Sequence, residues 1–133
     1  MKYSKLGNSQ LHVSRICLGC MGFGDSSNGQ HSWTVDEEHT REIIQHALEL
    51  GINFFDTAIA YQSGTSEQYL GRALRDFAPR DSVVVATKFL PRTQEEISAG
   101  ITGQKHIERM IDKSLKNLGM DYVDLYIYHM WDY

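Results

Sequence analysis

The chain has 133 residues, of which 41% are hydrophobic, and its 13 basic and 17 acidic residues give a formal net charge of −4. This length predicts one domain, and the interspersed charges leave no basic stripe for nucleic acid and no polybasic arm for a membrane surface. No apolar run approaches the ~18 residues of a membrane span, the start MKYSKLGNSQ lacks the apolar region of a signal peptide, and two cysteines make no secreted disulfide scaffold. We therefore expect a soluble, cytoplasmic protein.

The predicted elements begin with a pair of strands. The segments KYSKLG and LHVSRI, separated by residues 8–10, have the pattern of a short hairpin. Residues 16–20 (ICLGC) predict a first buried strand, and a loop rich in glycine and serine follows over residues 22–33. The TVDE segment, residues 34–37, has the form of a capping box, and apolar residues at helical spacing behind it predict a helix that Gly51 ends.

From there, strands and helices alternate. Residues 52–58 (INFFDTA), 82–88 (SVVVATK) and 122–129 (YVDLYIYH) are short apolar runs, which predict three further strands. Helices are predicted over residues 65–77 and near residues 104–117, where apolar side chains recur every three or four positions. Strands that alternate with helices favour right-handed crossovers and a parallel sheet, so we expect an α/β fold.

Four polar side chains fall where these parallel strands would end. Asp56 closes the second strand, Lys88 the third and His129 the fourth, while Tyr61 lies in the loop after the second strand. The carboxyl ends of parallel strands lie on one rim, and side-chain alternation puts each strand-end group on a mostly apolar face. A single charged residue at such a place usually marks only where the chain meets water, whereas four together predict a functional cluster.

The residue types in this cluster suit the reduction of a carbonyl group. Tyrosine is a poor acid with an ordinary pKa of about 10, and a nearby lysine ammonium stabilises its phenolate. A buried lysine keeps its proton if a carboxylate holds the charge, which Asp56 can do, and the histidine can donate a hydrogen bond to a substrate oxygen. The set can therefore deliver a proton to a carbonyl oxygen as it becomes an alkoxide.

A family resemblance rests on five stretches in chain order: KLGNSQLHVSRICLGCMGFG, GINFFDTAIAY, SEQYLGRALRD, VVVATK and LKNLGMDYVDLYIYHMWDY. Together they cover nearly the whole chain, and the strongest signature is GINFFDTA with its tyrosine, followed by ATK and a strand that ends in histidine. The chain resembles the aldo-keto reductases, specifically bacterial members near the potassium-channel β-subunit branch. The resemblance implies a (β/α)₈ TIM barrel that reduces aldehydes and ketones with NADPH.

The resemblance also implies roles for the four rim residues. It makes Tyr61 the general acid, whose pKa is lowered by Lys88 in its pair with Asp56, and it makes His129 the residue that orients the substrate carbonyl. Channel β-subunits tend to lack this histidine, so its presence here favours the enzymatic branch.

For the cofactor, the resemblance points to three residues. Asp56 lies where the family contacts the nicotinamide ribose, and Cys20 and Met21 lie where relatives line the cofactor near the first strand. The chain departs from the family at Gln62, because glycine commonly follows the tyrosine there. We therefore expect the loop around Tyr61 to differ.

A barrel of this kind takes about 250 residues and eight strands. This chain supplies a hairpin, four parallel strands and three helices, so the resemblance implies a single partial domain, residues 1–133, that is the N-terminal half of the barrel. Its open edge strands would allow self-association. All four catalytic positions lie in this half, while most of the family's grip on the adenosine and phosphates lies in the other. We therefore expect weak NADPH binding and poor turnover by the chain alone.

Two other readings of the function stay open. One is a non-catalytic module that binds nicotinamide or a partner protein, as in the channel-associated relatives. The other is a truncation product with no function of its own. The substrate and the choice between NADPH and NADH cannot be predicted from these residues.

Two further patterns predict no site. Cys17 and Cys20 form a C-x-x-C pair, but residues three apart on a strand point to opposite faces and no second pair exists, so no metal or redox centre is expected. The glycines at positions 19, 22 and 24 have the spacing G-x-x-G-x-G, which is not the dinucleotide fingerprint, and the helix begins too late for a phosphate loop.

Overall fold

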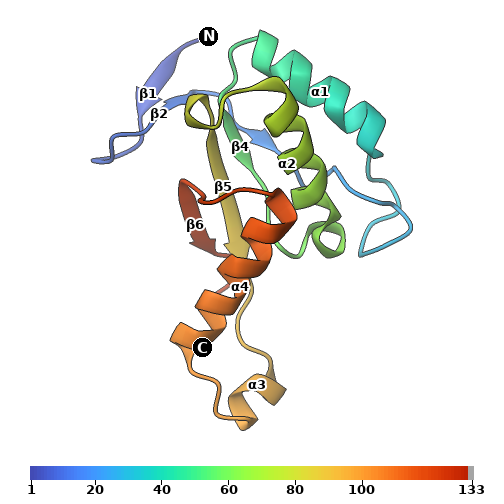
Figure 1. Cartoon of the computed structure of the whole chain (residues 1–133), viewed down its shortest axis with the longest axis vertical. Coiled ribbons are helices and arrows are strands. Elements are labelled where there is room, and N and C mark those ends of the chain that lie inside the picture. Colours follow the sequence, from blue (N-terminus) through green and yellow to red (C-terminus); the bar gives the residue numbers. More distant parts are fainter. Residues whose placement is uncertain (132–133) are drawn as a thin grey trace.

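The computed structural model describes residues 1–131. A two-stranded antiparallel hairpin opens the chain, with β1 (Tyr3–Lys5) paired to β2 (His12–Ser14), as predicted. Figure 1 shows the hairpin at one end of the molecule, away from the main sheet's carboxyl edge. The hairpin therefore contributes no side chain to the rim on which the predicted site residues lie.

The other strands form one parallel sheet, in the order β3 (Leu18–Gly19), β4 (Phe54–Asp56), β5 (Val84–Phe89) and β6 (Leu125–Tyr128). The predicted parallel sheet is thereby confirmed. Its register pairs Asp56 with Ala86 and Lys88 with Ile127. Because paired residues on neighbouring strands project from the same face, Asp56 and Lys88 share one face of the sheet.

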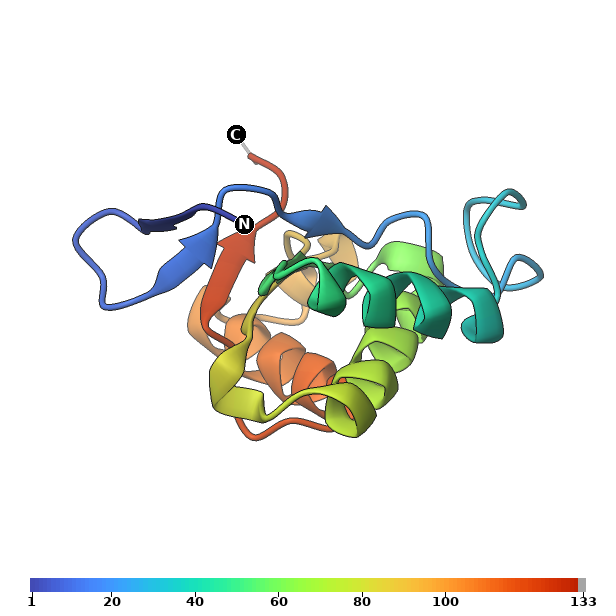
Figure 2. The same cartoon turned by 90° about the horizontal axis from the view of Figure 1, so that it is seen from above.

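Helices connect the strands, as the alternation predicts: α1 (Glu37–Glu49), α2 (Thr65–Phe77) and α4 (Gly103–Leu118). Seen from above, they lie along one side of the sheet (Figure 2). The helices α2 and α4 approach so closely that a Cβ on Gly71 would collide with the carbonyl oxygen of Leu118. None of the helices within residues 1–131 is long and apolar enough to cross a membrane.

The core lies between the helices and one face of the sheet. Phe55 and Val85 are fully buried on that face and alternate along their strands with the residues of the opposite face. They belong to one cluster with residues from all three long helices: Ile44, Leu70, Ala73, Leu74 and Leu118. Burial of each of the larger side chains in this cluster stabilises the fold by roughly 1.5–3 kcal/mol. The packing therefore fixes which strand residues face the helices and which face the site.

The two outer strands are less buried than expected. The first strand is only two residues long, and Ile16, predicted to lie within it, is 56% exposed. The residues of β6 are half-buried or exposed along its length. Among the described residues each of these strands has a neighbour on one side only, so apolar composition alone does not bury them.

The starts of two helices also correct the predictions. Asp36, and not Thr34, caps α1: its carboxylate accepts a hydrogen bond from the His39 amide (3.0 Å). Thr34 instead donates to the carbonyl oxygen of Gly24 (2.9 Å). A short helix that was not predicted, α3 (Gln94–Ser98), begins with a capping box at Thr93. The remaining short turns are 3₁₀ helices, η1 (Tyr61–Gly64) and η2 (Arg80–Ser82).

Candidate active site

A lysine near the end of β5 gathers the predicted site residues. Lys88 Nζ lies 2.7 Å from Oδ2 of Asp56, 2.9 Å from the carbonyl oxygen of Thr57 and 3.2 Å from the hydroxyl of Tyr61. An ammonium has three protons to donate, so these contacts match its full capacity. Sequence reasoning placed the carboxylate, lysine and phenol on one rim. It missed the Thr57 carbonyl, because a backbone group leaves no mark in a side-chain pattern.

The surroundings keep Lys88 charged. Burial opposes the charge and is the largest effect, but hydrogen bonds to Asp56 and Tyr61 and the charge of Asp56 outweigh it and raise the pKa of Lys88 above its ordinary value. The side chain is only 13% exposed, so water screens this charge little. An ammonium held in this way stabilises negative charge on an adjacent oxygen. The hydroxyl oxygen of Tyr61 is so placed.

A tight turn presents Tyr61 to the lysine. The Tyr61 amide donates to the carbonyl oxygen of Ala58 (3.2 Å), and the residue opens η1. The centroid of its ring lies 4.9 Å from Lys88 Nζ and 5.6 Å from the centroid of the His129 ring, which it meets edge to face. The tyrosine thus lies against a cation and an imidazole, the two groups expected to assist it.

His129 follows β6 directly, and its amide donates to the carbonyl oxygen of Phe89 (3.0 Å). Burial, and after it the charge of Lys88, lower the pKa of His129 below its ordinary value of 6.5. The ring is therefore neutral near pH 7, with one donor and one acceptor nitrogen. Its Nδ1 is buried and has no hydrogen-bond partner within residues 1–131, so the fold leaves hydrogen-bonding capacity of this ring unused.

The three predicted cofactor residues lie at different depths. The carboxylate of Asp56 keeps 30% of its side chain exposed, and Met21 is 45% exposed. Cys20 has no exposed surface, and its Sγ lies in the core, 3.5 Å from the carbonyl oxygen of Leu18. All three, Asp56, Cys20 and Met21, stay predicted cofactor residues.

The two cysteines lie apart in environment, as strand alternation predicts. Cys20 is buried while Cys17 is exposed, and both are free thiols. Partial burial, followed by the charge of Asp56, raises the pKa of Cys17 to about 11. Because the thiolate is the reactive form, the raised pKa lowers the reactivity of Cys17 at neutral pH.

A buried polar network ties the rim to α2. Thr87, the neighbour of Lys88 on β5, points the other way and donates to Glu67 (2.6 Å), which also accepts from the Asn117 side chain (2.8 Å). Ser66 lies 3.1 Å from the hydroxyl of Thr57. Glu67 is fully buried, and sequence reasoning missed it because a glutamate near a helix start normally faces water. These bonds hold the strand ends at fixed positions relative to the helix.

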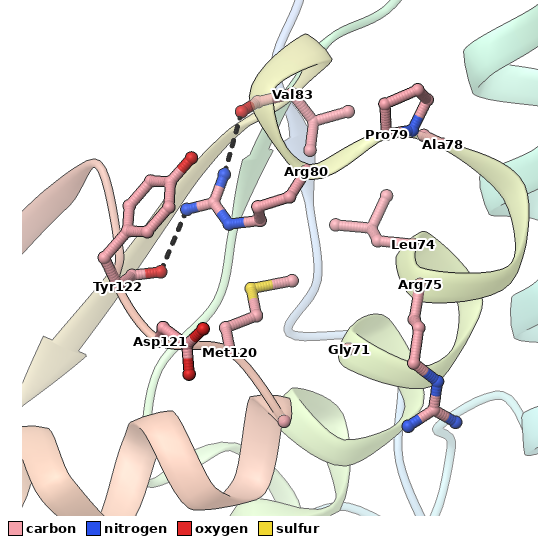
Figure 3. A pocket seen from close by; sticks show the side chains of 11 residues that line it. Gly71, Leu74, Arg75, Ala78, Pro79, Arg80, Val83, Met120, Asp121 and Tyr122 are labelled. Atoms are coloured by element: carbon pink, nitrogen blue, oxygen red, sulfur yellow. Dashed lines mark hydrogen bonds between the residues drawn. The ribbon is translucent and has the colours of Figure 1, made fainter.

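A cavity of about 350 Å³ lies at the opposite end of the sheet (Figure 3), between the end of α2, η2 and the segment before β6. None of the four predicted catalytic residues lines it. Arg80 extends along it and donates to the carbonyl oxygens of Val83 (3.1 Å) and Tyr122 (2.9 Å). These bonds join parts of the backbone, so Arg80 has a structural role at this end of the sheet.

Comparison with known proteins identifies relatives of this chain. Residues 15–133 match the aldo/keto reductase family. The chain is 35% identical over 131 residues to norsolorinic acid reductase B of Aspergillus parasiticus, covering 94% of this chain and 34% of that protein. It is 37% identical over 134 residues to a probable voltage-gated potassium channel subunit beta of Oryza sativa subsp. japonica, covering 99% of this chain and 38% of that protein.

Solved structures show the same fold. A thermostable aldo-keto reductase in complex with the inhibitor epalrestat matches with a TM-score of 0.78 at 28% identity, over 99% of this chain and 44% of that one. An aldo-keto reductase from Klebsiella pneumoniae in complex with NADPH matches with a TM-score of 0.70 at 26% identity, over 92% of this chain and 37% of that one. The chain thus spans less than half the length of these relatives, with part of their α/β barrel. It belongs to the aldo/keto reductase family.

Proposed function

We propose that this protein acts as an oxidoreductase that reduces aldehyde and ketone carbonyls to alcohols with NADPH. One observation carries the proposal: the Tyr61 hydroxyl lies 3.2 Å from the ammonium of Lys88, which lies 2.7 Å from Asp56. A carbonyl oxygen requires a proton donor as it becomes an alkoxide. Tyr61 can donate that proton, because the fixed ammonium of Lys88 stabilises the phenolate that remains. The reductase name of a fungal relative and the NADPH in a structural neighbour support the same chemistry.

The exposed groups on the rim fit a nicotinamide cofactor. Lys88 uses Oδ2 of Asp56, which leaves Oδ1 to accept a hydrogen bond from a ribose hydroxyl. Met21 offers exposed apolar surface next to the end of β3. When bound, NADPH supplies a hydride to the carbonyl carbon. Every other part of the reaction falls to side chains of this chain.

Tyr61 donates a hydrogen bond to the substrate carbonyl and transfers its proton as negative charge grows on that oxygen. Lys88 stabilises the resulting phenolate and Asp56 keeps the lysine charged, so charge separation is spread over three neighbouring groups. Water returns a proton to Tyr61 after the alcohol leaves. His129, neutral and 5.6 Å from the tyrosine ring, donates a second hydrogen bond that orients the carbonyl.

The proposal is tested by following the hydride. The chain is incubated with an aromatic aldehyde and NADPH that carries deuterium at both C4 positions of the nicotinamide, and the alcohol is analysed by mass spectrometry. We expect deuterium on the alcohol carbon with wild-type protein and none with Tyr61→Phe. NADPH binding, measured by quenching of protein fluorescence, should be equal for the two proteins. Unlabelled alcohol, or equal labelled product from both proteins, would contradict the proposal.

We further propose that the 133-residue chain by itself binds NADPH weakly and turns over slowly. It spans 34–44% of the length of the fungal reductase and the epalrestat-bound neighbour, and its edge strands β3 and β6 each have one partner strand among residues 1–131. Unpaired edges favour association between copies, which light scattering on a size-exclusion column measures. We expect dimers or larger species at high concentration, and a monomer at all concentrations would contradict this expectation.

The second candidate function is a non-catalytic nicotinamide-binding or partner-binding module. The rice channel-subunit relative, at 37% identity, is the observation that favours it. His129 weighs against it, because a neutral imidazole beside the tyrosine serves catalysis and not cofactor retention. The same isotope experiment separates the two functions, since a module of this kind binds NADPH without producing labelled alcohol.

A further inference from the structure

The residue after Tyr61 has an unusual backbone conformation. Gln62 (φ 47°, ψ 48°) and Ser63 (φ 54°, ψ 35°) are left-handed, and within residues 1–131 they are the residues other than glycine with positive φ. Side chains with a Cβ rarely adopt this region, because the Cβ crowds the following carbonyl oxygen. Gln62 is nevertheless 1% exposed. Such a strained residue persists only where the surrounding structure holds it in place, which points to a role for its side chain.

The amide of Gln62 supplies that hold. Its Oε1 accepts from the His31 amide (2.8 Å), and its Nε2 donates to the carbonyl oxygens of Asp25 (2.8 Å) and His31 (2.7 Å). All three partners are backbone groups of one loop, residues 24–33, which we call the clamped loop. A buried amide with both donor protons and its acceptor engaged fixes its neighbours in direction as well as distance. The clamped loop is thus bonded to the turn that carries Tyr61.

Neighbouring residues are shaped to admit this side chain. A Cβ on Gly24 or on Gly29 would collide with Gln62, and both glycines have positive φ. Thr65 reinforces the junction, since its hydroxyl donates to the Gln62 carbonyl (2.7 Å) and accepts from the Asp25 amide (2.9 Å). Both segments are therefore adapted to this contact: the turn holds Gln62 in a strained conformation, and the loop has glycines at the two positions where a Cβ would collide with it.

We propose that Gln62 is a positioning residue for Tyr61: its amide clamps residues 24–33 to the Tyr61 turn and so holds the phenol against Lys88 and His129. This role rests on the proposed function for its catalytic consequence. The turn itself bonds the Tyr61 backbone to Ala58 and to Thr65, and the clamp adds three hydrogen bonds from the next residue to a separate loop. The stacked rings of His31 and Trp33, 4.6 Å between centroids, belong to the clamped loop and are held with it.

The test uses two substitutions of Gln62: one removes the side chain, and the other keeps its shape but changes its hydrogen bonding. Gln62→Gly removes the clamp and adopts the left-handed backbone without strain, so the fold is retained. Gln62→Glu keeps the shape of the side chain but removes both donors and sets a carboxylate against two carbonyl oxygens. The matched control is Asn53→Ala. That residue is also an amide clamp, bonded to Ser14 (2.7 Å) and His12 (3.0 Å), but it lies at the amino end of β4.

Two readouts need no turnover. The rate of hydrogen exchange at the His31 amide reports whether the clamp is intact. The NMR resonances of the His129 ring report the position of the Tyr61 ring, because the two rings meet edge to face with 5.6 Å between their centroids. We expect exchange at His31 to accelerate at least about tenfold in Gln62→Gly, because the amide loses its acceptor. We expect it to accelerate in Gln62→Glu as well, because repulsion between the carboxylate and the carbonyl oxygens of Asp25 and His31 displaces the side chain. We also expect the His129 resonances to shift or broaden. The Asn53→Ala protein should match wild type in both.

Kinetics complete the test. We expect kcat for aldehyde reduction to fall about tenfold or more in Gln62→Gly with little change in the KM for NADPH, because a misplaced acid slows the proton transfer without weakening cofactor binding. Wild-type His129 resonances in both Gln62 variants would overturn the proposal, as would an equal response from Asn53→Ala. If wild-type protein reduces no aldehyde, the proposed function fails, and the exchange and resonance measurements alone decide whether Gln62 positions Tyr61.

Discussion

The two ends of the parallel sheet each carry a cation, an aspartate and a tyrosine, arranged in different ways. At the carboxyl end, Lys88 Nζ meets the hydroxyl of Tyr61 at 3.2 Å. At the amino end, the guanidinium of Arg80 lies over the ring of Tyr122, 3.9 Å from its centroid. The first arrangement acts on an acidic proton and the second on an aromatic face. A cation, an aspartate and a tyrosine therefore form the proposed proton donor site at one end and a structural contact at the other.

The bonding partners sharpen this contrast. Arg80 donates to two backbone carbonyl oxygens and to Asp124 (2.7 Å), which itself accepts from the Val85 amide (2.9 Å). An arginine does not lose its proton in a protein, so Arg80 is a fixed cation and not an acid or a base. The neighbouring cavity of about 350 Å³ lies at this amino end, and none of the four predicted catalytic residues lines it.

The largest effect should come from removing the cation at the carboxyl end. We expect Lys88→Met to lower kcat/KM for an aromatic aldehyde by about 100-fold or more, the range in which a general acid contributes. The reason is that the phenolate of Tyr61 loses the charge that stabilises it. Steady-state kinetics with NADPH measure the change. Lys105→Met, at an exposed position on α4, is the control and should retain wild-type kinetics. Activity of Lys88→Met within threefold of wild type would break the comparison.

Removing the cation at the amino end should change stability and leave catalysis intact. We expect Arg80→Met to lower the free energy of unfolding by about 2–3 kcal/mol, because Asp124 and two carbonyl oxygens lose their donor. Urea denaturation followed by circular dichroism measures the loss. At a temperature where the variant is folded, its kcat should lie within twofold of wild type. A large loss of kcat in the folded variant would show that this end contributes to the reaction.

The smallest effect concerns pH. The folded protein depresses the pKa of His129 below its ordinary value of 6.5, so below that pH the unfolded chain binds more protons than the folded one. The contribution of His129 to stability is therefore present above pH 6.5 and is lost as the pH falls through the lowered pKa. Urea midpoints measured from pH 7.5 down to about 5 should show this loss in wild type and a smaller one in His129→Gln. Identical profiles would contradict it.

Much of the rim could be predicted from the sequence because it depends on regular geometry. Alternation along a strand and a shared carboxyl edge were enough to place Asp56, Lys88 and the start of the Tyr61 loop together, and the register confirms that Asp56 and Lys88 share a face. The helices were predictable for a similar reason, since their apolar stripes recur at fixed spacing. In helices and strands, the spacing of residues along the chain predicts the face on which each side chain lies.

The rest depends on irregular or distant contacts. The clamp of Gln62 on residues 25–31 needs left-handed backbone and a bond across about thirty residues, and no periodic pattern encodes it. The pairing of Arg80 with Asp124, 44 residues apart, is equally hidden. The full burial of Cys20 in the core is a third example, because it depends on residues that are distant in the chain.

The most direct measurement compares the two tyrosines. Tyr61→Phe and Tyr122→Phe each remove one hydroxyl from a ring beside a cation, and the rates of aldehyde-dependent NADPH oxidation are measured side by side. We predict that Tyr61→Phe loses at least about 100-fold in kcat while Tyr122→Phe stays within twofold of wild type, because only the first hydroxyl bonds the cation. Equal rates for the two variants would contradict the assignment of Tyr61 as the proton donor.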